Sequence, residues 1–225
     1  KVNSFLGHSL GEYSALTASN IISLKDCAYL LKNRGEIMNS AYPVNKSGMA
    51  AIIGLSCDKV ENIIKENEIE IDVANDNSPS QVVISGIINN IKLCENIFMK
   101  NGAKKFVYLN VSAAFHSRIM EKAQQQMQAH LKKVTFKKPT SSVISNFSGT
   151  GSTDEEIIFK NLSNQMSNKV RWVESINYLE KIKEENIIEI GPGKILSGLI
   201  KRINAKFNVY NLNTIEDIES LKELK

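Results

Sequence analysis

The pentapeptide G-H-S-L-G at residues 7–11 constrains the fold of this chain more than any other stretch, because it demands a sharp reversal between two elements. An apolar, β-branched run at residues 2–6 precedes it, and a helix-forming stretch at residues 12–18 follows it. A G-x-S-x-G sequence in that setting predicts a strand, a tight turn and a helix, with Ser9 exposed at the carboxyl end of the strand. We expect both glycines to be needed, because the turn crowds the helix behind it.

Ser9 is the first candidate for chemistry. Its hydroxyl is expected to face the positive end of a helix, where a developing oxyanion is stabilised. A serine held in this way is typical of a nucleophile that forms an acyl intermediate. The plainer alternative is a glycine-flanked turn with a solvent-facing serine.

The rest of the chain alternates predicted strands and helices. Strands are expected at residues 49–55, 69–74, 81–85, 105–111, 142–146, 187–190 and 209–212. Helices are expected to begin at residue 23, to span residues 56–67, 89–100, 117–133, 153–166, 170–185 and 194–204, and to form the charged tail from residue 215. This alternation predicts an α/β fold with a mostly parallel sheet that is covered on both faces.

The order of elements changes in the middle of the chain. Between residues 46 and 111 it is β-α-β-β-α-β, which is typical of a ferredoxin-like lobe. The ends of such a lobe lie together, so it can be inserted into a larger domain. We therefore predict an α/β core subdomain of residues 1–45 and 112–225, with a ferredoxin-like small subdomain of residues 46–111 inserted into it.

We call the predicted strand-turn-helix around G-H-S-L-G the elbow. The helix that follows it carries an unusual charge. Ser23 with Asp26 three residues later predicts its capped N-terminus. Its expected apolar stripe consists of Leu24, Cys27, Leu31 and Met38. Arg34 lies on the same stripe, where an arginine usually extends its charge to the edge of the core. The alternative is a buried guanidinium that awaits a carboxylate, since a buried arginine needs a partner.

Composition excludes several classes of function. The 225 residues carry a net charge of +4, which favours anionic small ligands or acidic partners and gives no indication of nucleic-acid binding. Cys27, Cys57 and Cys94 lack metal-ligand spacing and are expected to be reduced core residues, so we predict no metal. No apolar stretch has membrane length and no signal peptide is visible, so we expect no membrane partner and a cytoplasmic protein.

The start of the sequence bears on whether the given chain is complete. Lys1 stands directly before the expected elbow strand, and such a strand is rarely the first element of an α/β sheet. We therefore expect the given sequence to lack an N-terminal part.

A serine nucleophile needs a general base, and three histidines are candidates. His8 neighbours Ser9, but adjacent side chains diverge on a sharp turn. His130 lies among polar residues and is expected on a solvated helix face. His116 lies where the small lobe ends and a helix begins, so it is expected to face a cleft between lobes, although a loop or capping histidine is the alternative. No acid stands out as a third member, but a main-chain carbonyl can also fix a histidine tautomer.

Six motifs, taken together, resemble the malonyl-CoA:acyl carrier protein transacylases and the acyltransferase domains of polyketide synthases. They are G-H-S-L-G-E at 7–12, K-N-R-G-E-I-M at 32–38, A-N-D-N-S-P-S-Q at 74–81 with V-I-S-G at 83–86, A-F-H-S at 114–117, V-R-W at 170–172 and E-I-G-P-G-K-I-L at 189–196. They occur in order over nearly the whole chain. The resemblance implies an α/β-hydrolase-like parallel-sheet core with the inserted small subdomain.

The resemblance also implies a role for each site residue. Ser9 attacks the thioester of malonyl-CoA, His116 takes its proton, and the backbone N–H of Leu10 receives the oxyanion. Arg34 pairs with the malonyl carboxylate in a bidentate geometry. Gln165 lends its main-chain carbonyl to His116 in place of the acid of a triad.

Two further residues follow from the same motifs. Asn75 in the small-lobe hairpin is a candidate for substrate binding. Phe115 is similar to the residue of malonyl-selective members, where it crowds a bulkier α-methyl group. The implied partners are malonyl-CoA as substrate and acyl carrier protein, which brings the accepting phosphopantetheine thiol, in fatty acid biosynthesis. No cofactor is expected on the chain itself.

One departure from the family affects the expected activity. An upstream Gly-Gln-Gly segment, whose glutamine backbone supplies the second oxyanion donor in the family, is absent from the sequence. The loss of one such donor typically lowers the rate about 100- to 1000-fold, so we expect this stretch alone to turn over poorly.

Other functions stay open at this point. One is an acyltransferase domain, or a trans-acting acyltransferase, of a polyketide synthase. A serine esterase of the α/β-hydrolase type predicts its histidine near the C-terminus, whereas about half of this chain follows His116. A non-catalytic module that binds carrier protein is a third possibility.

Overall fold

The elbow segment folds into a strand, a turn and a helix, as the sequence predicts. In the computed structural model, which describes residues 2–43 and 45–221, strand β1 (Ser4–Phe5) leads through the pentapeptide into helix α1 (Gly11–Ala18). The chain forms two compact units, with the division between residues 175 and 176. The predicted subdomain boundaries near residues 46 and 111 lie inside the first unit and stay a prediction.

Strand β1 is shorter than the apolar run at residues 2–6, because only two of its residues pair with a neighbouring strand. It pairs in parallel with β6 (Ser142–Ile144), with Ser4 opposite Ser142 and Phe5 opposite Val143. On its other side β6 pairs with β7 (Gly151–Ser152), an antiparallel strand that the sequence analysis did not predict. The elbow strand therefore has a parallel neighbour whose carboxyl end lies beside the turn.

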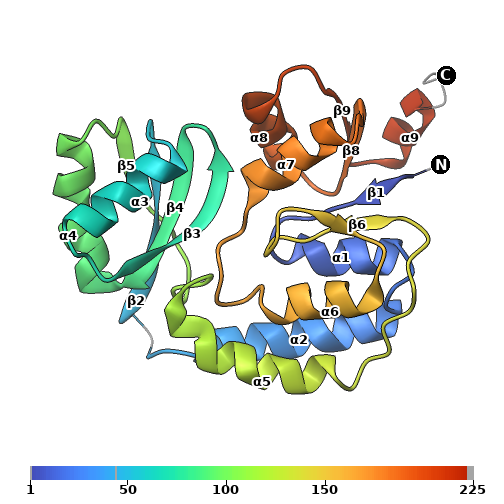
Figure 1. The fold of residues 1–225 in the computed structure, drawn as a ribbon, viewed down its shortest axis with the longest axis horizontal. Coiled ribbons are helices and arrows are strands. Elements are labelled where there is room, and N and C mark those ends of the chain that lie inside the picture. The colour runs from blue at the N-terminus through green and yellow to red at the C-terminus, as the bar shows by residue number, and fades with distance from the viewer. Residues whose placement is uncertain (1, 44, 222–225) are drawn as a thin grey trace. The chain divides into compact units, whose positions relative to one another are not determined.

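Four helices enclose the core beside this sheet. Helix α2 (Leu24–Ser40) packs against α1 and α5 (Glu121–Leu131), and α5 packs against α6 (Glu155–Ser163) (Figure 1). The fully buried members of this core include Tyr13, Leu16, Leu30, Met120 and Leu131. The helix predicted at residues 117–133 begins as a 3-10 turn (Arg118–Met120), and the one predicted at 153–166 is shortened at both ends.

Helix α2 confirms its predicted cap but not its whole stripe. The Ser23 hydroxyl accepts a hydrogen bond from the Asp26 N–H at 3.0 Å. The expectation that Leu24 faces the core is wrong, because it lies in the first turn beside the cap with its side chain 76% exposed. The buried residues of the helix are Cys27, Leu30, Arg34 and Met38.

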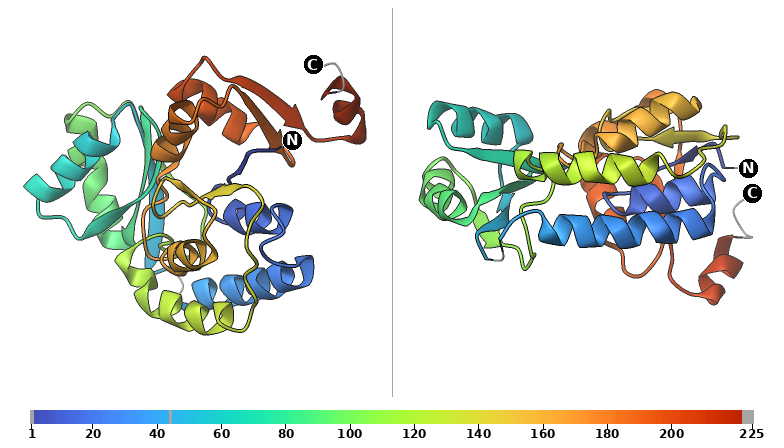
Figure 2. Two further views of the ribbon diagram at one scale, coloured as in Figure 1. Left: turned by 45° about the vertical axis from the view of Figure 1, so that its right-hand side comes forward. Right: turned by 90° about the horizontal axis from the view of Figure 1, so that it is seen from below.

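The middle of the chain has the predicted order of elements. These are β2 (Ser47–Ile53), α3 (Cys57–Glu66), β3 (Ile71–Ser78), β4 (Gln81–Ile87), α4 (Ile88–Lys100) and β5 (Lys105–Tyr108). The strands form one antiparallel sheet in the order β3-β4-β2-β5. Both helices cover the same face of it (Figure 2), where Val60 and Phe98 pack on residues such as Ile52 and Ile84.

Strand β3 is longer than the strand predicted at residues 69–74, which left residues 75–80 as a connection to the next strand. The strand continues through Ser78, and only Pro79 and Ser80 separate it from β4. Two register shifts absorb this polar segment, and the backbone around Asn75 pairs with Val170. The hydrogen bonds from the Val170 N–H to the Ala74 carbonyl (2.8 Å) and from the Asp76 N–H to the Val170 carbonyl (3.0 Å) satisfy the backbone there.

The second unit has its own parallel pair. Helix α7 (Trp172–Lys181) crosses the division, and strands β8 (Asn186–Ile190) and β9 (Asn208–Leu212) pair in parallel. The Glu189 carboxylate accepts the N–H groups of Leu196 and Ser197 at 3.0 and 2.9 Å and so caps helix α8 (Ile195–Ile203). A last helix, α9, spans Ile215–Leu221.

The expectation of one mostly parallel sheet is wrong for the part of the chain that the structure describes. The parallel pairs β1–β6 and β8–β9 belong to separate small sheets, and the largest sheet is the antiparallel one. What holds is a mixed α/β fold. All three cysteines are free and buried, as expected.

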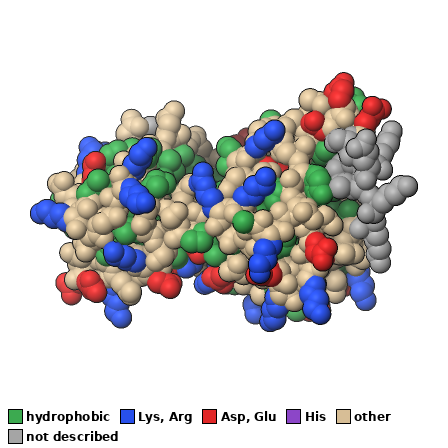
Figure 3. Space-filling view, turned by 90° about the horizontal axis from the view of Figure 1, so that it is seen from above, with side chains coloured by type: hydrophobic (Ala, Val, Ile, Leu, Met, Phe, Trp, Pro, Cys, Tyr) green, Lys and Arg blue, Asp and Glu red, His purple; other side chains and the backbone are tan. Residues whose placement is uncertain are grey.

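Two further features concern the surface and the helices. On the face shown in Figure 3, Lys and Arg side chains are spread among polar and apolar ones. Among the described helices, none is both long and apolar enough to cross a bilayer.

Candidate active site

Ser9 lies at the apex of the turn in a conformation that the Asn146 side chain supports. Its φ angle is 52°, a left-handed value that is uncommon for a residue other than glycine. Its N–H donates to the Asn146 side-chain oxygen at 2.6 Å, and the Asn146 amide donates to the Gly7 carbonyl at 2.7 Å. Asn146, just beyond β6, thus bridges both arms of the turn.

The two glycines of the pentapeptide differ in what they do. A Cβ atom at Gly7 would lie 2.0 Å from the Gly11 carbonyl oxygen, so only glycine fits where the strand passes the helix. A Cβ atom at Gly11 would meet nothing within 4 Å. The expectation that crowding requires both glycines is therefore wrong for Gly11.

His116 lies within hydrogen-bonding distance of Ser9. Its Nε2 lies 2.7 Å from Ser9 Oγ. Its Nδ1 lies 3.1 Å from the Gln165 carbonyl and 3.2 Å from the Asn168 carbonyl. Carbonyl oxygens only accept, so Nδ1 carries the hydrogen and Nε2 offers its lone pair to the serine hydroxyl.

The surroundings of His116 keep the imidazole neutral. The side chain is 3% exposed, and its backbone has the left-handed φ of 55°. Burial, and next the charge of Arg34, lower the pKa of His116 to about 3. At neutral pH the ring is therefore an unprotonated acceptor that becomes charged only when it takes a proton.

Arg34 is buried and does not extend to the edge of the core. Its guanidinium lies 5.6 Å from the centre of the Tyr13 ring. One terminal nitrogen, Nη2, donates to Ser9 Oγ at 3.0 Å and to Gln165 Oε1 at 3.3 Å, whereas the buried Nε has no hydrogen-bond partner. An unpaired donor on a buried cation is costly, so the site is suited to receive an anion.

Gln165 lies where its carbonyl reaches His116, and its side chain does more than was expected. The Nε2 group donates to the Ser9 carbonyl at 2.9 Å and to the Glu12 carboxylate at 2.7 Å. Its Oε1 faces Arg34. One residue therefore contacts Ser9, His116 and Arg34.

Sequence reasoning missed Glu12 and Asn146. Glu12 is 2% exposed, and its carboxylate also accepts the Asn146 N–H at 3.1 Å. A glutamate in the first turn of a helix is ordinarily a favourable charge near the positive helix end, so its position in the sequence does not indicate burial. Asn146 ends the predicted strand at 142–146, and a polar residue at the carboxyl end of a strand was a signal that was available.

The other predicted residues have the following positions. Leu10 precedes the first residue of α1, so its backbone lies at the positive helix end beside Ser9. Phe115 is partly buried. It packs against the helical core and against the face of the antiparallel sheet that α3 and α4 do not cover. Asn75 is buried on β3, and its backbone pairs with Val170.

The two remaining histidines hydrogen-bond side chains other than Ser9. The His8 ring bonds Asn77 Oδ1 at 2.8 Å and lies 5.3 Å from the Trp172 ring. His130 is half-buried, and its Nδ1 bonds the Tyr29 hydroxyl at 2.8 Å, so it is tied to helix α2 and is not simply solvated.

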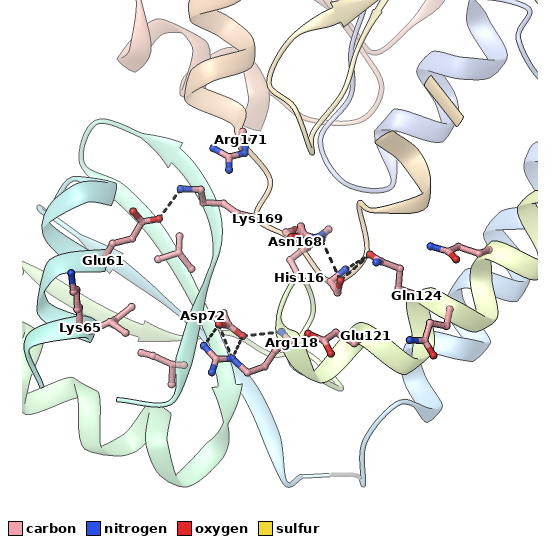
Figure 4. Close-up of a pocket in the computed structure, with 16 residues that line it drawn as sticks. Glu61, Lys65, Asp72, His116, Arg118, Glu121, Gln124, Asn168, Lys169 and Arg171 are labelled. Carbon is pink, nitrogen blue, oxygen red and sulfur yellow. Dashed lines mark hydrogen bonds and ion pairs between the residues drawn. The ribbon is translucent and has the colours of Figure 1, made fainter. Parts of the chain in front are cut away.

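A cleft of about 960 Å³ borders His116 on the side of Asn168 (Figure 4). Figure 4 shows Arg118 held by Asp72 and Lys169 held by Glu61, with closest N–O distances of 2.6 and 2.7 Å. Neither Ser9 nor Arg34 belongs to the described residues that line this cleft. Four of its charged side chains are thus paired with one another.

The arrangement at Ser9 is suited to acyl transfer. A hydroxyl faces a neutral imidazole, a helix N-terminus adjoins it, and a buried cation contacts the same oxygen. Within the described residues no group of three or more His, Cys, Asp or Glu side chains could hold a metal ion. This arrangement can act as a serine nucleophile with an anion-binding group beside it.

Comparison with known proteins agrees with this geometry. The sequence profile of the acyl transferase domain matches residues 2–213. A malonyl CoA-acyl carrier protein transacylase of Bacillus subtilis (strain 168) is 39% identical over 216 residues, which cover 95% of this chain and 68% of that protein.

Two solved structures extend the comparison. The acyl-carrier-protein-S-malonyltransferase of Bartonella henselae has a TM-score of 0.95 and 40% identity, and the match covers 100% of this chain and 72% of that one. A malonyl-transacylase in complex with its type II PKS acyl-carrier protein has a TM-score of 0.95 and 32% identity, with 100% and 74% covered. The chain therefore belongs to the acyl transferase domain family and, within it, to the malonyl-CoA:acyl carrier protein transacylases.

Proposed function

We propose that this protein transfers the malonyl group of malonyl-CoA to the phosphopantetheine thiol of acyl carrier protein, through a malonyl-Ser9 intermediate, in fatty acid biosynthesis. The observation that carries the proposal is that one oxygen, Ser9 Oγ, lies 2.7 Å from a neutral imidazole and 3.0 Å from a buried guanidinium. The first contact supplies a base for the nucleophile, and the second places a cation where a carboxylated acyl group would lie.

In the acylation step, His116 Nε2 takes the Ser9 proton as Oγ attacks the thioester carbonyl. The Leu10 N–H, at the start of α1, receives the oxyanion of the tetrahedral intermediate. When the carbon–sulfur bond breaks, the coenzyme A thiolate leaves and takes the proton from His116. The Gln165 and Asn168 carbonyls support the imidazolium that forms, in the place of a triad acid.

The second step repeats the first with a different thiol. His116 takes the proton of the phosphopantetheine thiol, the sulfur attacks the malonyl ester, and Ser9 Oγ leaves and regains the proton. Acyl carrier protein is the proposed partner because the related complex described above contains such a protein. A polyketide carrier protein is the alternative acceptor for the same chemistry, since that complex comes from a type II PKS.

Arg34 selects the carboxylate in this proposal. Its Nε has no partner in the buried site, and a malonyl carboxylate would satisfy it together with a terminal nitrogen. Phe115 and Asn75 are proposed to limit the α-substituent and to contact the substrate. Both are buried or partly buried residues.

An esterase of the α/β-hydrolase type is less well supported. That chemistry uses an acid that follows the serine and orients the histidine. Here Nδ1 of His116 faces two main-chain carbonyls, and Glu12, a buried acid, bonds Gln165 and Asn146.

For the fold, we infer an α/β-hydrolase-like core with an inserted ferredoxin-like subdomain. The parallel β1–β6 pair around the elbow supports the first part. The β-α-β-β-α-β order with sheet order β3-β4-β2-β5 supports the second. The cytoplasmic location and the absence of a bound cofactor stay predictions.

A transfer assay tests this function. The natural protein is mixed with malonyl-CoA and phosphopantetheinylated acyl carrier protein, and the mass of the carrier protein is followed. We expect it to rise by one malonyl group, at a rate that falls by about 100-fold or more in His116→Ala because base assistance is lost. His130→Ala is the matched control and should transfer at the wild-type rate. Equal losses in the two variants would contradict the role of His116.

A further inference from the structure

One buried charge has no part in the steps above. The Glu12 side chain is 2% exposed and lies on α1, three residues after Ser9. A carboxylate that is removed from water is unfavourable unless hydrogen bonds and opposite charge compensate it. The contacts of this carboxylate therefore indicate its role.

Glu12 joins two residues that contact the reacting groups. A single oxygen, Oε2, accepts from Gln165 Nε2 at 2.7 Å and from the Asn146 N–H at 3.1 Å. Asn146 in turn holds both arms of the Ser9 turn. Glu12 thus accepts hydrogen bonds both from Asn146, which holds the Ser9 turn, and from Gln165, which contacts His116.

The Glu12 contact also fixes the orientation of the Gln165 amide. Because Nε2 donates to Glu12 and to the Ser9 carbonyl, Oε1 must point the other way, toward Arg34. The same residue presents its main-chain carbonyl to His116. A rotated or released Gln165 side chain would disturb Arg34, His116 and Ser9 together.

We propose that Glu12 is a positioning residue that must be ionised to hold Gln165. Its protonation, not that of His116, then sets the acid limb of the pH–rate profile, which is the decline in the rate of malonyl transfer at low pH. The inference rests on the proposed function. A carboxylate is a stronger acceptor for two converging N–H donors than a protonated carboxyl group, so protonation loosens the network. The effect reaches the reacting atoms only through Gln165 and Asn146.

The electrostatic surroundings agree with this geometry. Burial raises the pKa of Glu12 to about 7, against hydrogen bonds from Gln165, Asn146 and Ser145 and the charge of Arg34. Arg34 on α2 is the charged group that faces it, and burial lowers the pKa of that guanidinium.

The other titratable neighbours hold their charge state over this range. Burial raises the pKa of Tyr13 to about 12, and the pKa of His116 is about 3. Between pH 5 and 8 the group that changes charge in this network is therefore Glu12. The ionised form is lost as pH falls, and at pH 6 about a tenth of Glu12 is ionised.

The test is the pH dependence of Ser9 malonylation in Glu12→Gln. Glutamine keeps an oxygen that can accept both N–H groups but cannot titrate. The rate at saturating malonyl-CoA is measured by quenching and intact-mass analysis between pH 5 and 9. We expect the wild-type rate to fall about tenfold from pH 8 to pH 6, and the variant to show a flat profile at about one tenth of the wild-type rate at pH 8, because a neutral side chain reproduces the protonated network.

Two other variants separate position from charge. Glu36→Gln, at an exposed glutamate of α2, is the matched control and should keep the wild-type acid limb. Glu12→Ala removes the acceptor and should lower the rate at pH 8 by about 10- to 100-fold, because the Gln165 and Asn146 donors lose a charged partner. An unchanged acid limb in Glu12→Gln, or a wild-type rate in Glu12→Ala, would overturn the proposal.

A spectroscopic measurement does not depend on how the Glu12 variants fold. An infrared difference spectrum between pH 6 and 8 should contain the band of a buried protonated carboxyl group that disappears with a midpoint near pH 7, and this band should remain in Asp76→Asn, which removes the other buried carboxyl group with a raised pKa. Absence of a buried carboxyl titration in that range would overturn the proposal even if no variant folds. A wild-type protein that is never malonylated at Ser9 would instead refute the proposed function.

Discussion

At the scale of single residues, three side chains share one oxygen atom. Ser9 Oγ donates to His116 and accepts from Arg34, so the cation that is proposed to bind the acyl carboxylate also contacts the nucleophile. The same cation helps to lower the pKa of His116, after burial. A carboxylate paired with Arg34 would offset its charge, and His116 would then take up a proton more readily.

Arg34→Ala tests whether this cation selects the acyl group. We expect kcat/KM for malonyl-CoA to fall at least about 100-fold, because the malonyl carboxylate would be buried without its partner. The value for acetyl-CoA should change much less, since acetyl has no carboxylate. Arg34→Lys should recover only part of the loss, because an ammonium group lacks the planar fork.

The comparison to make is the ratio of the two kcat/KM values in wild type and in Arg34→Ala. A ratio that does not change would mean that Arg34 has a structural role only, and the assignment of a malonyl substrate would lose its main physical support.

The candidate site residues differ in how far the sequence indicated them. Ser9 and His116 could be predicted because their local sequences dictate a turn and a junction. Arg34 interrupts an apolar stripe, although its burial was the less expected of two outcomes. Asn146 offered only its place at the end of a predicted strand, and Glu12 offered no local signal, because their contacts join segments more than 130 residues apart.

At the scale of elements, the strand-turn-helix unit depends on one close contact. Gly7→Ala would place a methyl group 2.0 Å from a backbone oxygen of the helix, an atom that cannot move aside without shifting α1. We expect this substitution to lower the free energy of unfolding by about 3 kcal/mol or more, or to prevent folding.

Gly11→Ala is the matched control, because its methyl group would meet nothing within 4 Å. Alanine is also a better helix former than glycine, so the free energy of unfolding should stay equal or rise by up to about 1 kcal/mol. Urea denaturation of the two variants measures both. Equal destabilisation would show that the strand and helix do not approach each other as described.

Strand β3 shows why element boundaries were hard to predict. Residues 75–80, N-D-N-S-P-S, have the composition of a turn, and local preference alone places them outside a strand. The pairing of the Asn75 backbone with Val170, 95 residues later, keeps the chain extended through Ser78. Such a long-range backbone contact leaves no local signal in the sequence.

At the scale of the whole molecule, the alternation of elements predicted a mixed α/β protein, and the order of the antiparallel lobe was right. The parallel sheet was overestimated, because alternation predicts parallel neighbours but not how many pair. In the described residues they form two separate pairs.

The pH dependence of stability is a property at this scale, and Asp76 contributes to it. Burial raises its pKa to about 6, and the charge of Lys169 opposes the shift. A raised carboxyl pKa means that the folded state binds the proton more tightly than the unfolded state, so this contribution to stability is lost as pH rises from about 4 through 6.

Asp76→Asn should therefore raise the free energy of unfolding at pH 8 and leave it nearly unchanged at pH 4. Chemical denaturation at both values measures this, with Glu66→Gln, at an exposed position on α3, as the control. A variant that is destabilised at pH 8 but not at pH 4 would show that the Asp76 charge is favourable in the folded protein and would contradict this account.

The central claim is that Ser9 carries the malonyl group. Its most direct test is the intact mass of the natural protein after mixing with malonyl-CoA in the absence of acyl carrier protein, followed by peptide mapping. The account predicts one malonyl adduct, located on the peptide that contains Ser9 and absent from Ser9→Ala. An adduct that persists in Ser9→Ala, or one that maps to another peptide, would contradict it.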